Sequence, residues 1–208
     1  MTAPDGSPGG AAHTAGAPAA PAAQLDAPTR ILQATARLLA ERGVARFNLQ
    51  EVAEAAAVSK GLIHYHYHDR DTLLTRLVES LAADVARRQQ AALVDATAET
   101  AVDDLWQWLD GELRRGQLRV LQELTQEPGA LVRSAVNAAA AHRRAAAAAT
   151  VERLLALHGR RPRLPHRLLA EVVVAFEDGL VLAAVVQPEQ DPRLAFDVFW
   201  LAVLRLVE

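Results

Sequence analysis

The sequence has no cysteine, one lysine, few aromatic residues and no long uncharged apolar run. Without cysteine there are no disulfide bonds and no thiolate chemistry, which fits a reducing, cytoplasmic setting. No stretch approaches 18 uncharged apolar residues, so we predict no transmembrane helix. The net charge is −3, which excludes a uniformly basic nucleic-acid binder. Any affinity for DNA must therefore come from a local patch.

The first 24 residues are rich in alanine, proline and glycine and contain neither arginine nor lysine. Such a segment buries too little apolar surface to offset chain entropy, so we expect a disordered tail. It lacks the basic start and the leucine-rich run of a signal peptide. Contact of this tail with DNA is an alternative that we disfavour, because the segment carries no positive charge.

The excess of alanine and leucine and the helical spacing of apolar residues predict an all-α fold of about nine helices. Asn48, Ser59 and Asp69 are predicted to cap three of them. We expect a helix-turn-helix domain over residues 25–68 and a larger helical bundle over residues 69–208. The expected helices cover residues 27–43, 49–56, 59–66, 69–93, 102–115, 117–126, 130–158, 166–187 and 192–207.

Residues 48–72 predict two short helices joined by a tight turn, the shape of a helix-turn-helix. In that motif the second helix enters the major groove of DNA, with its first residues toward the bases. Lys60 stands at the first helical position, where it can reach phosphate or guanine, and Gly61 lets the backbone approach DNA closely. Four arginines against one glutamate give residues 27–50 a local charge of +3, which supplies the basic patch.

The run His64-Tyr65-His66-Tyr67-His68 admits two interpretations. His64 and His68 are four residues apart, which is a metal-ligand spacing on a continuous helix. The helix should end near His66, however, and the run contains no third ligand. Hydroxyl and imidazole groups also suit hydrogen bonds to phosphates and bases. We therefore predict DNA-facing or solvated side chains and no metal site, with stronger phosphate binding when the histidines are protonated.

Three segments carry a resemblance to a known family: TRILQATARLLAERG, NLQEVAEAAAVSKGLIHYHY and DRDTLL. Residues 29–74 resemble the DNA-binding domain of the TetR family of bacterial transcriptional regulators. The resemblance implies a homodimer with one DNA-binding unit per subunit and a ligand pocket in the C-terminal bundle. It also implies DNA contacts from Arg30, Asn48, Gln50, Lys60, Gly61, Leu62, His64, Tyr65, His66 and Arg70.

The sequence departs from the family pattern at four places. Ala57 stands in the turn where the family usually has glycine, which costs roughly 1 kcal/mol if the position needs a positive φ. Arg70 replaces the usual lysine, and His66-Tyr67 replaces the usual Tyr-Phe pair. Leu62 stands where a threonine or serine often donates to phosphate, so a polar contact is not expected from it.

The last two predicted helices are apolar on nearly every side, and a helix of that kind is buried on every side. This favours pairing with a second subunit over the alternative, an ordinary monomeric core. The segment FEDGLVLAAV is similar to the eighth helix of many TetR-family regulators, in which a small residue lets two helices cross closely. We predict a four-helix dimer interface that includes Leu168, Val172, Phe176, Gly179, Val186, Phe196, Phe199, Trp200 and Val203.

The middle helices are expected to hold the ligand pocket. Residues i and i+2 of a helix diverge, so Trp106 and Trp108 cannot both face it. Acidic groups in the pocket would favour a cationic ligand, whereas Arg119 or His142 there would favour an anionic one. The predicted lining residues are Trp106, Leu109, Asp110, Leu113, Arg119, Leu121, Glu123, Asn137, Phe176 and Leu180.

We expect a transcriptional regulator, most often a repressor in the family that the sequence resembles. It would bind a palindromic operator as a homodimer and be released by a small-molecule ligand. The alternative is a regulator of the same fold, an activator or a constitutive binder, without such a ligand. An enzyme is disfavoured because the sequence shows no nucleophile–base pair, phosphate-binding loop or metal spacing. No cofactor and no membrane partner are expected.

Overall fold

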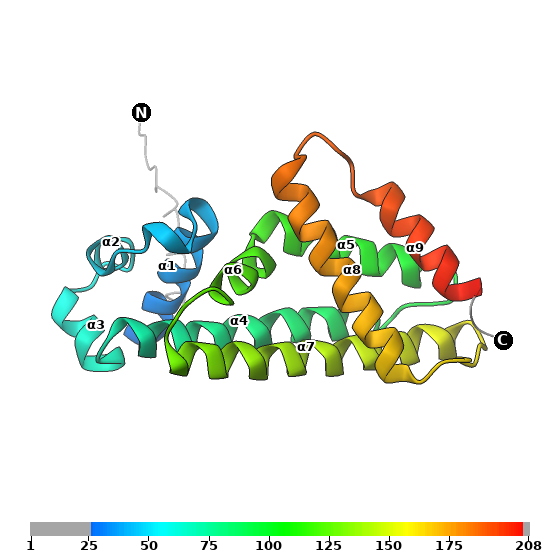
Figure 1. Cartoon of the computed structure of the whole chain (residues 1–208), viewed down its shortest axis with the longest axis horizontal. Coiled ribbons are helices and arrows are strands. Elements are labelled where there is room, and N and C mark those ends of the chain that lie inside the picture. Colours follow the sequence, from blue (N-terminus) through cyan, green and yellow to red (C-terminus); the bar gives the residue numbers. More distant parts are fainter. Residues whose placement is uncertain (1–25, 206–208) are drawn as a thin grey trace, which may run out of the picture.

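The computed structural model describes residues 26–205, and over that range the chain forms nine α-helices, one 3-10 turn and no β-strand (Figure 1). The prediction of an all-α fold is therefore confirmed. The predicted N-terminal tail, residues 1–24, lies outside the described residues, as does the end of the last predicted helix at residues 206 and 207.

The observed helices begin and end within two residues of the predicted positions wherever the structure describes them. One element was not predicted, the 3-10 turn η1, which follows the glycine that ends the first helix. A single turn leaves no apolar period to detect. The elements are α1 (Ala27–Arg42), η1 (Val44–Arg46), α2 (Leu49–Ala55), α3 (Lys60–Tyr67), α4 (Arg70–Ala92), α5 (Ala101–Arg115), α6 (Gln117–Leu124), α7 (Ala130–Leu157), α8 (His166–Val186) and α9 (Arg193–Arg205).

The helices form two parts, which Figure 1 shows along one long axis. Helices α1, α2 and α3 gather at one end, and we call them the N-terminal unit. Helices α4–α9 form the C-terminal body, in which α4 and α7 lie side by side along the axis while α8 packs across α7. Helix α4 begins in the N-terminal unit and runs into the body, so it links the two parts directly.

The N-terminal unit is fixed by three helix caps and a small core. The side chains of Asn48, Ser59 and Asp69 each accept a hydrogen bond from a backbone N–H of the following helix, at 2.7 to 3.1 Å, as predicted. The Tyr67 hydroxyl donates to the Pro28 carbonyl at 3.0 Å and ties α3 to the start of α1. The buried side chains of this core are Ile31, Ala34, Val52, Ala53, Ala56, Ile63, Tyr67 and Leu73.

The body is organised by the contact between α4 and α7. Four of the nine buried residues of α7 are alanines, namely Ala135, Ala139, Ala146 and Ala147. Short side chains let the two backbones approach closely, so an alanine-rich helix with little amphipathic character can still be a central element. Among residues 26–205 no helix is both long and apolar enough to cross a membrane.

The turn between α2 and α3 contains a strained residue. Ala57 has φ of +52°, in the left-handed region where a Cβ atom is unfavourable. Its side chain is exposed, so no packing contact depends on it. The family glycine is absent at the one position of this turn that needs it.

We predict that Ala57→Gly raises the free energy of unfolding by about 1 kcal/mol, because relief of the strain exceeds the added entropy of the unfolded chain. The matched control is Ala55→Gly, at an exposed helical position of α2, which should lower the free energy of unfolding by about 0.5–1 kcal/mol. Urea denaturation measures both. A loss of stability in Ala57→Gly would contradict the strain argument.

Candidate nucleic-acid interface and ligand site

Helix α3 presents a polar, solvent-exposed face at the end of the molecule. Lys60, Gly61, His64 and Tyr65 are exposed on it, and Tyr65 keeps 75% of its surface open although it is a large aromatic residue. A Cβ added at Gly61 would meet only the Ser59 hydroxyl at 3.8 Å, so the fold itself does not require glycine there. The opposite face, with Ile63 and Tyr67, is buried in the N-terminal unit.

His64 is held in one orientation by the end of its own helix. Its Nδ1 lies 3.0 Å from the carbonyl oxygen of His68, the residue that ends α3 with φ of +59°. A carbonyl can only accept, so Nδ1 carries the ring proton in this contact. Nε2 is then the ring nitrogen available to an external donor or acceptor. Within residues 26–205 no three His, Cys, Asp or Glu side chains form a group that could hold a metal ion.

The other predicted DNA contacts lie in different settings. Asn48 and Gln50 are exposed at the start of α2, where Gln50 also donates to Glu54 at 3.0 Å. Leu62 and His66 are half-buried on α3. Arg30 is half-buried on α1, and its Nε atom has no hydrogen-bond partner.

Arg70 takes part in an internal ion pair. Its guanidinium donates to both carboxylate oxygens of Glu127, at 2.7 and 3.1 Å, and lies 5.2 Å from the centre of the Phe47 ring. This pair raises the pKa of Arg70 and lowers the pKa of Glu127. Arg70 therefore joins the start of α4 to the loop between α6 and α7, instead of standing free beside α3.

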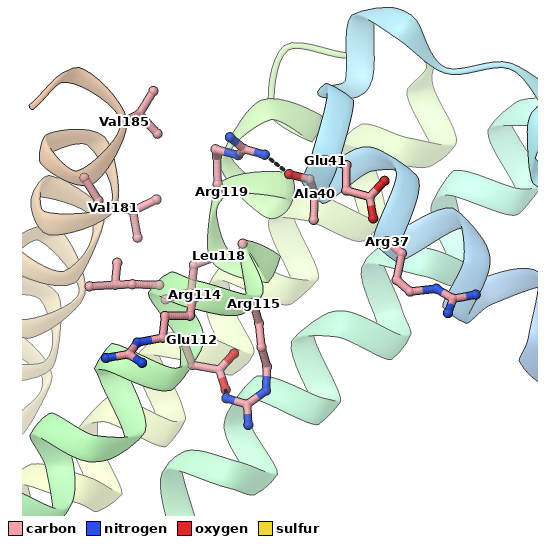
Figure 2. Close-up of a pocket in the computed structure, with 13 residues that line it drawn as sticks. Arg37, Ala40, Glu41, Glu112, Arg114, Arg115, Leu118, Arg119, Val181 and Val185 are labelled. Carbon is pink, nitrogen blue, oxygen red and sulfur yellow. Dashed lines mark hydrogen bonds and ion pairs between the residues drawn. The ribbon is translucent and has the colours of Figure 1, made fainter. Parts of the chain in front are cut away.

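Two residues of α6 hold the end of α1. Arg119 donates to the carbonyl oxygen of Ala40 (Figure 2). Glu123 accepts from the backbone N–H of Val44 at 2.7 Å. Gly43, with φ of +79°, lies between the Ala40 carbonyl and the Val44 N–H. A Cβ on Gly43 would lie 3.2 Å from the Glu123 carboxylate, so the contact also needs a glycine. We call Arg119, Glu123 and Glu127, with their partners, the junction contacts.

A groove of about 520 Å³ opens beside the junction contacts (Figure 2). Ala40 and Glu41 of α1 form one wall, and Val181 and Val185 of α8 face them from the other side. The turn between α5 and α6 forms its floor. The groove separates the N-terminal unit from α8, so the two parts touch mainly through α4 and α6.

Helices α8 and α9 carry an apolar surface that nothing in the described chain covers. We call it the outer stripe. On α8 its members are spaced by three, four or seven residues, which places them on one side of the helix, as in a helix that packs on a partner helix. The outer stripe consists of Leu168, Val172, Gly179, Leu182 and Val186 on α8, and Leu194, Val198 and Leu201 on α9.

The residues predicted for the dimer interface divide between two faces. Leu168, Val172, Gly179 and Val186 lie on the outer stripe. Phe196, Trp200 and Val203 are instead buried in the core of the same chain, and Phe176 and Phe199 are half-buried and stacked on each other. Both faces of α9 are apolar, so its sequence does not distinguish the inward face from the outward one.

The structure does not bring the predicted pocket residues together. Leu109, Leu121 and Leu180 are buried in the core, and Asn137 is exposed on α7. Trp106 packs against Phe196 and Arg193, and Asp110 pairs with Arg114 at the surface. Leu113 and Arg119 line the groove of Figure 2, Glu123 belongs to the junction contacts, and Phe176 alone lines a cavity inside the body.

That cavity lies between α4, α5, α7, α8 and α9, and we call it the closed cavity. Its open volume is about 10 Å³, which is room for one water molecule at most. Trp108 lines it, whereas Trp106 does not. The lining residues are Gln89, Leu105, Trp108, Thr150, Val173, Phe176, Glu177, Phe196, Phe199 and Trp200.

Glu177 is the acidic group of the closed cavity. Its carboxylate accepts hydrogen bonds from Arg143 at 3.2 Å and from Gln89 at 3.4 Å, and Arg143 also donates to Asp178 at 2.8 Å. Burial raises the pKa of Glu177 to about 7, although Arg143 opposes the shift. A second buried carboxylate, Glu112, is held by Arg88 at 2.5 and 2.9 Å and joins α4 to α5.

Comparison with known proteins connects this geometry to a class. Residues 31–77 match the model of bacterial regulatory proteins of the tetR family. The HTH-type transcriptional regulator TtgR of Pseudomonas putida is 33% identical over 95 residues, which are 46% of this chain and 41% of TtgR. The chain thus matches less than half the length of this relative in sequence.

Solved structures extend the likeness to the whole fold. A crystal structure from Rhodococcus sp., described as a TetR-family transcriptional regulator, has a TM-score of 0.68 at 23% identity and covers 86% of this chain and 97% of its own. A transcriptional regulator from Saccharomonospora viridis in complex with choline has a TM-score of 0.59 at 24% identity, over 77% of this chain and 86% of its own. Residues 31–77 thus match the tetR family of bacterial regulatory proteins, and the fold of the described chain is similar to that of a TetR-family regulator.

Proposed function

We propose that the protein is a repressor that binds a palindromic operator as a homodimer and is released by a small-molecule effector bound in the body. The observation that carries the proposal is the exposed polar face of α3 at the end of a molecule whose other end carries the uncovered outer stripe. Pairing through the stripe gives two copies of α3, and helix-turn-helix dimers read half-sites about one helical turn apart.

A continuous set of contacts supports release by an effector. Asp178 is a neighbour of Glu177 at the closed cavity, and its backbone carbonyl accepts from Gln122 of α6 at 3.2 Å. The next residue of α6, Glu123, holds Val44 of the N-terminal unit. A ligand that moves α8 against α6 would therefore act on the junction contacts. Such packed and hydrogen-bonded chains are the physical basis of coupling between sites.

One observation favours a second candidate function, a regulator of the same family without a small-molecule effector. The closed cavity is filled by its own aromatic side chains and has no room for a ligand as it stands. A ligand that binds the native state raises the melting temperature of the protein. A broad compound library in which no compound changes the melting temperature would therefore support this second candidate over the first.

We predict that Lys60→Ala weakens binding to the promoter region of the protein's own gene and reduces its salt dependence. Each lost phosphate contact lowers the slope of log affinity against log salt by about 0.9, so a dimer should lose roughly two units. Fluorescence anisotropy over a salt series measures the slope. Arg153→Ala, which removes an exposed charge from α7, is the matched control and should leave the slope unchanged. Equal affinity of the unsubstituted protein for promoter and random DNA would contradict the proposal.

We predict that Leu182→Arg converts the dimer to a monomer and abolishes operator binding. Leu182 is 60% exposed on the outer stripe, so the substitution should leave the fold of the subunit intact. Leu131→Arg is the matched control, because Leu131 is 59% exposed on α7 and lies outside the stripe. Sedimentation equilibrium measures the mass, and circular dichroism checks the helix content. A Leu182→Arg protein that remains a dimer would refute this interface.

A further inference from the structure

The closed cavity is walled by aromatic rings and contains one carboxylate. The faces of aromatic rings carry partial negative charge, so rings and carboxylate together attract a cation and repel an anion. The rings are those of Trp108, Phe176, Phe196, Phe199 and Trp200, and the carboxylate is that of Glu177.

The polar side of the cavity has one carboxylate more than it has guanidinium groups. Arg143 of α7 is shared between Glu177 and Asp178 of α8, and α4 contributes the uncharged Gln89. The residues of α5 and α9 that line the cavity carry no charge. With both carboxylates ionised the cluster keeps a net negative charge, and burial penalises the charge of Glu177, whose side chain is 8% exposed, more than that of Asp178, whose side chain is 40% exposed. A proton on Glu177, or a cation in the cavity, removes that charge.

One polar group in the lining of the closed cavity lacks a hydrogen-bond partner. The indole N–H of Trp108 is buried and has no hydrogen-bond partner, a state that native proteins seldom leave unsatisfied. Phe176 and Phe199 are stacked, with ring centres 4.0 Å apart and planes 2° from parallel. Both rings are half-buried, so an outward rotation of Phe199 can free the volume of a ring inside the cavity.

We propose that the closed cavity is the effector site and that it takes a small organic ammonium ion. The ammonium group lies among the rings beside Glu177, and Phe199 turns outward to admit it. This inference rests on the proposed ligand-responsive function and names the chemical class of the effector. It also gives a direction for pH: the cation and the proton compete for the same carboxylate, so affinity rises with pH.

The test is isothermal titration calorimetry of the full-length dimer with benzyltrimethylammonium and with its neutral analogue 2-methyl-1-phenylpropan-2-ol. The two compounds have nearly the same shape, and the hydroxyl of the neutral one can even bind the Trp108 N–H, so the comparison is biased against the proposal. At pH 8 we expect the cation to bind at least about tenfold more tightly. Equal binding of the two compounds, or no binding of the cation at 10 mM, would overturn the proposal.

A variant and a pH series locate the site. Glu177→Gln should abolish the preference for the cation, whereas Asp110→Asn, which removes a partly exposed carboxylate on α5, should keep it. In the unsubstituted protein the affinity for the cation should rise severalfold between pH 6 and pH 8, and the affinity for the neutral compound should stay constant. The pH series needs no variant, so it decides even if Glu177→Gln does not fold. A cation preference that is independent of pH would place the site elsewhere.

Anisotropy with promoter DNA, measured on the same samples, separates this inference from the proposed function. Promoter binding without a cation preference would overturn the inference and leave the repressor proposal standing. A cation preference in a protein that does not distinguish its promoter from random DNA would overturn the repressor proposal and leave the inference about the cavity standing. Release of promoter DNA by benzyltrimethylammonium, with no release by the neutral analogue, would support both.

Discussion

Two carboxylates decide how the N-terminal unit sits on the body. Glu123 accepts a hydrogen bond from the backbone N–H of Val44, and Glu127 forms a bidentate ion pair with the guanidinium of Arg70 at the start of α4. Arg119 also donates to Ala40, and Leu39 and Val44 pack with apolar residues of α4 and α6, while a groove separates the unit from α8. Hydrogen bonds to charged groups contribute roughly 1.5–3 kcal/mol each. An effector that binds one state preferentially supplies coupling of the size of one such hydrogen bond, so it can break a single junction contact.

The same constraint explains why the body is built as it is. Helix α6 touches the N-terminal unit with Glu123 and touches α8 with Gln122, so one short helix joins both partners. Helix α8 in turn carries Glu177 toward the closed cavity and the outer stripe toward solvent. In the proposed function the ligand, the partner subunit and the DNA-binding unit would therefore all contact α6 or α8. In that function a change in one of these contacts would reach the others through the packed helices.

The fold could be predicted from the sequence because capping residues and helical periods mark nearly every helix, and the TetR resemblance placed α1–α3. The proposed ligand site could not be predicted, although the sequence of α5 contained part of the information. Trp108 shares the spacing of Leu105, Leu109 and Glu112, all buried on one face of α5, whereas Trp106 does not. Two other features could be known only from the three-dimensional structure. Which apolar face of α9 turns outward, and that Glu123 would meet a backbone N–H 79 residues away, depend on how the helices pack.

The central claim is that the junction contacts set the distance between the two DNA-binding units of a dimer. The sequence has no cysteine, so Ala55→Cys alone places one spin label on each DNA-binding unit. Pulsed electron–electron double resonance then measures the distance between the two labels. We expect a narrow distribution of distances that broadens when Glu123→Gln and Glu127→Gln are combined. Glu79→Gln, which breaks a surface pair with Arg76, should leave it narrow. An unchanged distribution in the combined variant would contradict the account.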